Sequence, residues 1–223
     1  MPATDEFTRA RLQMVQIIAL YAEQTSPPLP GGRIDERLTS ALARVPRHEF
    51  VPSEIRGYAY ADGPLPIGYD KTISQPFMAA LMTGLLAVEP DHAVLEVGTG
   101  LGYHAALLGM LCRHVYTVEI IEELASQARA NLDRFGGGHV EVRVGDGTRG
   151  WPEHAPFDRI LVAAGAEELP PELVEQLVPG GRMVIPLGPP DSQLMTLIEK
   201  LEDGRLRATE VMAVRFAPLE SYH

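Results

Sequence analysis

The sequence predicts an α/β fold in which a mostly parallel sheet is covered by helices on both faces. Strand-like and helix-like segments alternate regularly from residue 93 to residue 186, and the first of these strands ends in a glycine-rich turn. Two further strand-like runs follow with no helix between them. Regular alternation is typical of a doubly wound parallel sheet, whereas two adjacent strands joined by a short turn pair antiparallel.

The N-terminal third is expected to begin with helices and to continue as an irregular segment. Residues 5–24 carry apolar side chains at helical spacing. A loop at Pro27–Gly32 separates them from a second expected helix over residues 34–45. From Pro46 to Lys71 prolines, glycines and tyrosines are dense and show little periodicity, which indicates a segment that wraps the body of the protein. A third helix is expected over residues 75–88.

The rest of the chain supplies the strands and helices of the sheet. The expected strands are 93–97, 114–119, 139–144, 157–163 and 181–186, and the helices between them are 102–111, 121–135 and 170–177. Two final strands, Gln193–Lys200 and Glu210–Phe216, are separated by Asp203-Gly204 and predict a C-terminal hairpin. The sheet would then have seven strands.

Composition excludes several classes of protein. A net charge of −11 argues against broad nucleic-acid binding, which needs a basic face. No apolar run approaches the roughly 20 residues of a transmembrane span, and the start Met1–Phe7 lacks the layout of a signal peptide. The single cysteine, Cys112, rules out an internal disulfide and a cysteine-based metal cluster, and its apolar helical context predicts a buried thiol. We expect a cytoplasmic protein with no metal site.

The glycine-rich turn and an acid after the next strand predict a nucleotide-bearing cofactor. Glycines 98, 100 and 102 follow the strand 93–97, and Glu119 ends the strand 114–119, where it can accept hydrogen bonds from both ribose hydroxyls. A dinucleotide site has the spacing G-x-G-x-x-G, but here it is G-x-G-x-G with Glu96 just before it. S-adenosylmethionine has no pyrophosphate, so acids near the turn are tolerable. A tight strand-to-helix turn without a ligand is the simpler alternative.

Several separated blocks resemble the protein-L-isoaspartate (D-aspartate) O-methyltransferases, which are class I S-adenosylmethionine-dependent methyltransferases. The resemblance runs from about residue 34 to the end. Its residues are Arg47-His-Glu-Phe-Val-Pro52, Pro64-Leu-Pro-Ile-Gly68, Thr72-Ile-Ser-Gln-Pro76, Leu95-Glu-Val-Gly-Thr-Gly100, Gly145-Asp-Gly147, Pro179–Pro186 and Val214–Leu219. The block at 72–76 is specific to this family, and the glycine turn is shared by many methyltransferases.

The resemblance implies a fold and an activity. The fold would be Rossmann-like, as a single methyltransferase domain over residues 1–223, with N-terminal helices and a wrapping loop over 1–74 and the core over 75–223. The activity would be methyl transfer from S-adenosyl-L-methionine to the free carboxylate of L-isoaspartyl residues in damaged proteins or peptides. These peptides and proteins would be the partners.

The resemblance also implies a set of site residues. Ser74 would be catalytic, although a serine followed by Gln-Pro is also a good helix N-cap. The N-terminus of helix 75–88 would offer amide donors to an anion, and Asp146 would accept a hydrogen bond from the adenine amino group. The expected cofactor-binding residues are Lys71, Thr72, Ile73, Ser74, Glu96, Gly98, Thr99, Gly100, Gly102, Glu119, Asp146 and Gly147, and the substrate-binding residues are Ser74, Val214 and Arg215.

Two departures from the family pattern bear on specificity. Tyr69-Asp-Lys71 stands where relatives commonly have glycine, glutamine or alanine, and Leu101 replaces a frequent serine. Lys71 could attract a peptide carboxylate or pair with Asp70. A same-fold methyltransferase for normal aspartate or for a small-molecule carboxylate, a nicotinamide-dependent dehydrogenase and a non-catalytic binding module are the alternatives. The glycine spacing and the terminal hairpin disfavour the dehydrogenase, and the intact block at 72–74 disfavours the binding module.

Overall fold

The computed structural model describes residues 5–24, 33–137 and 139–222. The loop expected at Pro27–Gly32 lies outside these residues. The described part contains a seven-stranded sheet in the order β5-β4-β3-β6-β7-β8-β9. Its strands are β3 Ala93–Val97, β4 His114–Glu119, β5 Val140–Val144, β6 Phe157–Val162, β7 Leu177–Leu187, β8 Gln193–Lys200 and β9 Leu206–Val214. The predicted α/β, Rossmann-like sheet is confirmed.

The strand directions follow the prediction. Strands β3 to β7 pair parallel with one another, whereas β8 pairs antiparallel with β7, and β9 pairs antiparallel with β8. The chain moves outward from β3 to β4 and β5 and then returns to the other side of β3 with β6. In open α/β sheets ligands bind outside the carboxyl ends of the strands at such a reversal. The reversal between β3 and β6 therefore marks the expected position of a site.

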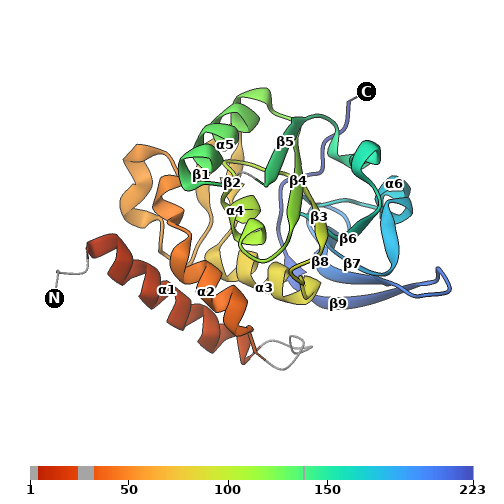
Figure 1. Cartoon of the computed structure of the whole chain (residues 1–223), viewed down its shortest axis with the longest axis horizontal. Coiled ribbons are helices and arrows are strands. Elements are labelled where there is room, and N and C mark those ends of the chain that lie inside the picture. Colours follow the sequence, from red (N-terminus) through yellow and green to blue (C-terminus); the bar gives the residue numbers. More distant parts are fainter. Residues whose placement is uncertain (1–4, 25–32, 138, 223) are drawn as a thin grey trace.

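Helices cover the two faces of the sheet unequally (Figure 1). The helices α3 Pro76–Leu86, α4 Tyr103–Gly109 and α5 Glu122–Phe135 contribute to the larger apolar core, together with one face of the strands. The short helix α6 Pro171–Glu175 and the 3-10 turn at Pro152–His154 lie at the smaller core on the other face. Right-handed crossovers require this division, because the chain runs in opposite directions across the sheet before and after β5.

Two N-terminal helices form an outer layer against α3. The helices α1 Glu6–Ala22 and α2 Glu36–Arg44 bury apolar residues such as Ile18 and Leu42 in the larger core. Each begins at an aspartate, Asp5 or Asp35, whose side chain accepts a hydrogen bond from a backbone amide of the first turn. Figure 1 shows this pair of helices on the side of α3 away from the strands.

The irregular segment contains structure that the sequence did not reveal. It has two 3-10 turns, Arg47–Glu49 and Ser53–Tyr58, and a small hairpin of β1 Leu65–Gly68 and β2 Lys71–Ile73. The two residues of its turn, Tyr69 and Asp70, have φ values of 53° and 55°. A turn of this type usually contains Asn-Gly or Asp-Gly. Because Tyr-Asp lacks that signature, the hairpin was missed.

The observed bounds of α6, β7 and β9 differ from those expected from the sequence, because strand pairing in the folded sheet decided where these elements begin and end. The helix expected at 170–177 ends at Glu175, since Leu177 already pairs with Phe157 and β7 begins four residues earlier than expected. The last strand covers Leu206–Val214 rather than 210–216, because Lys200 pairs with Leu206 across the turn. Arg215 and Phe216 therefore lie beyond the strand.

The structure also bears on the expectations for Cys112 and for membrane-spanning helices. Cys112 is buried, and burial raises the pKa of its thiol to about 12, so the expected buried thiol is confirmed. Among the residues that the structure describes, no helix combines the length and the apolar character needed to cross a bilayer.

Candidate active site

A cavity with a volume of about 310 Å³ lies at the reversal of the sheet. Its floor is formed by residues at or just after the carboxyl ends of β3, β4 and β6, including Gly98, Glu119 and Ala163. The β1–β2 hairpin and the start of α3 form one wall, and residues 212–220 of the C-terminal segment cover the opposite side. The size is in the range of pockets that hold small-molecule ligands.

The glycine turn presents backbone to this cavity. Gly98 and Gly100 have φ values of 94° and 54°, a region that L side chains rarely adopt, and both line the cavity. A Cβ atom at Gly100 would lie 3.2 Å from the side chain of Ile67 on the hairpin. The turn therefore combines a left-handed backbone with a close approach of the hairpin, which explains the glycines there.

Glu119 lines the cavity with its carboxylate fixed in place. Its Oε2 accepts a hydrogen bond from the Gly100 amide at 2.8 Å, and its Oε1 accepts one from the Ile121 amide at 3.1 Å. Burial raises the pKa of Glu119, whereas these amides and the nearby Lys71 lower it. A carboxylate has about four lone-pair positions, so Glu119 keeps capacity to accept hydrogen bonds from a ligand.

Ser74 lies at the junction of the large cavity and a smaller one of about 50 Å³. Thr72 lines both cavities, while Ile73 and Thr99 line only the smaller one. Among the described residues, no partner hydrogen-bonds to the Ser74 hydroxyl. The N-cap position of α3 is occupied by Gln75 and not by Ser74. The helix-cap interpretation of Ser74 is therefore wrong, and its hydroxyl is free to meet a ligand.

The start of α3 is less available to an anion than the sequence suggested. Its first residue, Pro76, has no amide hydrogen, and the amide of Phe77 donates to Asp62 Oδ1 at 3.2 Å. A carboxylate of the protein itself thus occupies the place where a substrate anion was expected. The Phe77 amide is therefore not available to a substrate anion, and the expectation that amides of helix 75–88 bind the substrate stays a prediction for the rest of the first turn.

Lys71 bridges the cavity instead of pairing with its neighbour Asp70. Its Nζ atom lies 2.5 Å from Oε1 of Glu220, so an ion pair joins the β1–β2 hairpin to the C-terminal segment. Both residues line the large cavity. The sequence could not reveal this pair, because 149 positions separate the two residues.

The other expected cofactor residues divide between the cavities and their surroundings. Gly147 lines the large cavity, where a Cβ atom would collide with Val97 at 2.3 Å. Gly102 lines neither cavity and serves as the N-cap of α4, with its Cα packed near Leu132 of α5. Asp146 also lines neither cavity, and its carboxylate accepts hydrogen bonds from Thr148 and from the Tyr222 amide.

Glu96 is enclosed within the sheet, away from both cavities. It is paired in register with Thr117 of β4, and the Thr117 hydroxyl donates to Glu96 Oε2 at 2.6 Å. Burial raises the pKa of Glu96 to about 8, so the group is protonated at neutral pH. The structure does not place Glu96 with the other expected cofactor residues, because Glu96 lies inside the strand β3, before the glycine turn begins.

The expected substrate residues Val214 and Arg215 both line the large cavity. Val214 is the last residue of β9, and Arg215 begins the segment that follows it. The Gln193 side chain fixes the path of this segment, because its Oε1 accepts from the Phe216 amide at 2.7 Å and its Nε2 donates to the Phe216 carbonyl. The segment then pairs with Gly165: the Leu219 amide donates to the Gly165 carbonyl, and the Gly165 amide donates to the Ala217 carbonyl. Residues 214–219 are thereby held over the cavity.

Some residues at the cavity were not among the site residues expected from the sequence. They are Gln75, Met78, Ile120, Leu124, Met212 and Glu220. Ile120 could have been found, since it directly follows Glu119 at a strand end. The others reach the cavity only through the packing of α3, α5 and the C-terminal segment. Within the described residues, no group of three or more His, Cys, Asp or Glu side chains could hold a metal ion.

Residues 31–223 match the model of the family described as protein-L-isoaspartate(D-aspartate) O-methyltransferase. The chain belongs to this family. It is 49% identical over 215 residues to "Protein-L-isoaspartate O-methyltransferase 1" of Polaromonas sp. (strain JS666), covering 96% of this chain and 91% of the relative. It is 50% identical over 223 residues to the enzyme of that family name from Aeropyrum pernix, covering 98% of this chain and 82% of the relative.

Solved structures agree with this assignment. A protein-L-isoaspartate O-methyltransferase superposes with a TM-score of 0.82 at 28% identity, over 95% of this chain and 66% of that chain. A structure from Plasmodium falciparum, determined in complex with S-adenosyl-L-homocysteine, has the same fold with a TM-score of 0.80 at 21% identity, over 98% of this chain and all of that chain. The expectation that the chain is a member of this family is confirmed.

Proposed function

We propose that the cavity at the reversal of the sheet is the active site in which this chain carries out the reaction of its family. That reaction is transfer of a methyl group from S-adenosyl-L-methionine to the free carboxylate of L-isoaspartyl residues in damaged proteins or peptides. One observation carries the placement: Ser74, with an unpaired hydroxyl, lines the same cavity as Glu119 and the glycine turn.

The residues present fit an adenosine-bearing methyl donor. Glu119 has free lone pairs for the two ribose hydroxyls, and Gly98 and Gly100 leave room for the ligand against bare backbone. The small cavity beside Ser74, lined by Thr72, Ile73 and Thr99, would take the methionine end. Gly147 would lie beside the adenine, and Asp146 would have to turn toward the cavity, which it does not line, to accept a hydrogen bond from the adenine amino group. When bound, the donor supplies a methyl group activated by a positively charged sulfur.

The chemistry asks the protein for alignment more than for proton transfer. A carboxylate of pKa near 4 is ionised at neutral pH, so no general base is required. The Ser74 hydroxyl would donate a hydrogen bond to the oxygen that does not attack, which orients the other oxygen toward the methyl group. Holding the reactants in line supplies a large part of the rate enhancement in such reactions. The C-terminal segment, held by Lys71 and Glu220, would exclude water from the cavity.

Selectivity for isoaspartyl residues would follow from geometry. An isoaspartyl link adds a methylene to the backbone and presents the α-carboxylate where an ordinary residue continues as peptide chain. A pocket closed by Val214, Arg215 and the hairpin would leave no room for a continuing chain at that point. The methyl ester would then collapse to a succinimide, and hydrolysis would return part of the population to normal aspartate.

Residues 1–74 and 75–223 would act as one methyltransferase domain, since Pro64, Ile67 and Lys71 line the same cavity as the strand ends of the core. The location would be cytoplasmic, as the cysteine content suggests.

The test is methyl incorporation from labelled S-adenosylmethionine into matched peptides that contain either aspartate or isoaspartate at one position. The proposal expects label in the isoaspartyl peptide alone. Equal labelling of both peptides would contradict the proposed selectivity and would direct attention to Tyr69-Asp-Lys71. Labelling of neither peptide, together with labelling of a free dicarboxylic acid, would support a small-molecule carboxylate as substrate.

A further inference from the structure

Arg47 is buried in a way that its charge makes costly. It belongs to the first 3-10 turn of the wrapping segment and is fully excluded from solvent. No carboxylate among the described residues lies within 4.0 Å of its guanidinium, and its Nη1 has no hydrogen-bond partner there. Burial lowers the pKa of Arg47, although an arginine remains charged at neutral pH. Burying a charge without a counter-charge is unfavourable, so the contacts that Arg47 does make must offset that cost.

Two of those contacts are hydrogen bonds to backbone carbonyls, and one holds the turn that carries Ser74. Nη2 donates to the Ser74 carbonyl at 2.7 Å, and Nε donates to the Ala59 carbonyl at 2.8 Å. The guanidinium also lies over the ring of Tyr103, 4.7 Å from its centroid. Tyr103 belongs to α4, which follows the glycine turn. Arg47 thus connects the Ser74 turn to the helix behind the predicted cofactor site.

The same turn is held from a second direction by Asp62, also in the wrapping segment. Its Oδ2 accepts from the Gln75 side chain at 2.7 Å, and its Oδ1 accepts from the Phe77 amide at 3.2 Å. Ser74 and Gln75 lie between the end of β2 and the start of α3, where Gln75 is the N-cap residue and its carbonyl accepts a hydrogen bond from the Ala79 amide. Without the side chains of Arg47 and Asp62, the Ser74–Gln75 turn would have few contacts to fix it.

We propose that Arg47 and Asp62 are positioning residues, which fix the Ser74–Gln75 turn so that the Ser74 hydroxyl points at the substrate carboxylate. The proposal rests on the function proposed for Ser74 above. It assigns a purpose to the segment between α2 and the hairpin: this segment carries both side chains that hold the turn, and it contributes no hydroxyl or carboxylate of its own to the reaction.

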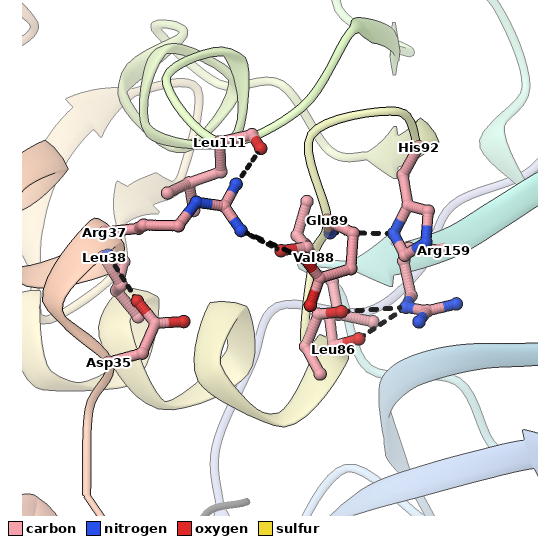
Figure 2. Close-up of polar contacts among 10 residues, drawn as sticks. Asp35, Arg37, Leu38, Leu86, Val88, Glu89, His92, Leu111 and Arg159 are labelled. Atoms are coloured by element: carbon pink, nitrogen blue, oxygen red, sulfur yellow. Dashed lines mark hydrogen bonds and ion pairs between the residues drawn. The ribbon is translucent and has the colours of Figure 1, made fainter.

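Two other arginines bind backbone carbonyls near the opposite end of α3, and they serve as a comparison (Figure 2). Arg159 of β6 donates through Nε to the Leu86 carbonyl at 2.6 Å, and Arg37 of α2 donates to the carbonyls of Val88 and Leu111. Both are partly exposed and neither lines either cavity. Like Arg47, they stabilise the chain through hydrogen bonds from a guanidinium to backbone carbonyls. These bonds lie at the C-terminal end of α3, where no ligand is expected.

The experiment compares Arg47→Lys with the matched control Arg159→Lys. A lysine keeps the charge but has a single nitrogen in place of the planar guanidinium, so it cannot reproduce the separate positions of the Nε and Nη2 donors. For Arg47→Lys we expect kcat for the isoaspartyl peptide to fall about tenfold to a hundredfold, since small misplacements of a positioned group have effects of that size. The peptide KM should rise while the Kd for S-adenosylhomocysteine stays within twofold. Arg159→Lys should lower the melting temperature and leave kcat and KM within twofold.

A double-mutant cycle with Ser74→Ala distinguishes the positioning role of Arg47 from the function proposed for Ser74. If Arg47 acts through Ser74, Arg47→Lys should have little further effect on kcat in the Ser74→Ala background. Equal effects of Arg47→Lys in both backgrounds would overturn the positioning role. Normal turnover in Ser74→Ala would overturn the function proposed for Ser74 itself. Peptide affinity, measured by fluorescence anisotropy with S-adenosylhomocysteine bound, should follow the same cycle and does not depend on turnover.

Asp62→Asn tests the same positioning role through the second side chain that holds the turn, and it serves in place of Arg47→Lys if that variant does not fold. Asp62→Asn keeps an acceptor for the Phe77 amide but weakens the contact with Gln75, and Asp62 is only half-buried. It should lower kcat for the isoaspartyl peptide in a Ser74-dependent manner, with unchanged affinity for S-adenosylhomocysteine. A folded Asp62→Asn with the kinetics of the unsubstituted protein would overturn the proposal.

Discussion

At the scale of single residues, Glu119 illustrates how a carboxylate is prepared for a ligand. Backbone amides of Gly100 and Ile121 each take one of its oxygens, so the carboxylate has a fixed orientation before any ligand arrives. The amide of Gly100 comes from the glycine turn, which means that the acid and the turn also fix one another. A group held in this way binds its ligand with little further ordering.

Replacement of Glu119 by alanine should weaken binding of S-adenosylhomocysteine. The loss should be about 1–3 kcal/mol, because hydrogen bonds from two hydroxyls to a charged acceptor disappear. Isothermal titration calorimetry measures the change, and Glu122→Ala on the exposed start of α5 is the matched control. A dissociation constant that did not change would remove Glu119 from the proposed cofactor site.

Glu96 is the second residue-scale case, and it makes the stability of the protein depend on pH. Its folded pKa of about 8 results first from burial and is opposed by the hydrogen bond from Thr117. A raised pKa means that the folded state binds the proton more tightly than the unfolded state does. Its contribution to stability is therefore complete below about pH 4.5 and is lost as the pH rises through about 8.

The variant Glu96→Gln, which cannot ionise, should show a weaker pH dependence than the unsubstituted protein. The free energy of unfolding of the unsubstituted protein should fall by on the order of 3 kcal/mol more than that of the variant between pH 5 and pH 9. Urea unfolding at a series of pH values measures both. Parallel pH profiles would show that Glu96 does not titrate in this range.

At the scale of elements, two helices end at residues in the same left-handed region but with different side chains. The helix α5 ends at Gly136, with φ of 89°, and α3 ends at Ala87, with φ of 48°. An alanine pays a steric cost in this region that a glycine does not. No atom lies within 4 Å of the position that a Cβ on Gly136 would take, so only the backbone conformation penalises a side chain there.

Gly136→Ala should therefore destabilise the protein by about 1 kcal/mol. The reverse change, Ala87→Gly, should leave stability unchanged or raise it slightly, because the relief of backbone strain is offset by the greater entropy of glycine in the unfolded chain. Thermal unfolding of the two variants gives both values. A stable Gly136→Ala would mean that α5 can end without the left-handed residue.

At the scale of the whole molecule, the cavity joins parts of the chain that are far apart in sequence. Its lining comes from the hairpin, the ends of three strands, the start of α3 and the C-terminal segment. The chain end itself returns to β5, where the Tyr222 amide donates to Asp146, and the blue end of the ribbon can be followed to that place in Figure 1. A ligand in the cavity would contact all these parts, and its binding energy would therefore add to the stability of the fold.

S-adenosylhomocysteine should consequently raise the stability of the folded protein. A ligand present at a hundred times its Kd stabilises by about 2.7 kcal/mol when it binds the folded state alone. We expect a rise in melting temperature that grows with the logarithm of the ligand concentration, whereas NAD at the same concentrations should produce none. A shift with NAD and none with S-adenosylhomocysteine would favour the dehydrogenase alternative.

The sequence by itself determined the elements whose signals are local. Apolar periodicity located α1 to α5 and the strands β3 to β6 to within a few residues, and the final strand pair was recognisable from Asp203-Gly204. The glycine turn and Glu119 were predictable because a strand end, a turn and an acid at fixed spacing meet at one edge of a parallel sheet. The blocks shared with the family added Ser74 and the segment 214–219.

Only the tertiary structure decided the features that depend on distant contacts. The turn Tyr69-Asp70 forms a hairpin because the flanking strands pair, and no local signature predicts it. Burial and register direct Glu96 into the sheet and away from the cavity. Lys71 meets Glu220, and Arg47 reaches Ser74, across long stretches of chain. Such contacts form when separate elements pack together, so the order of residues along the chain carries little information about them.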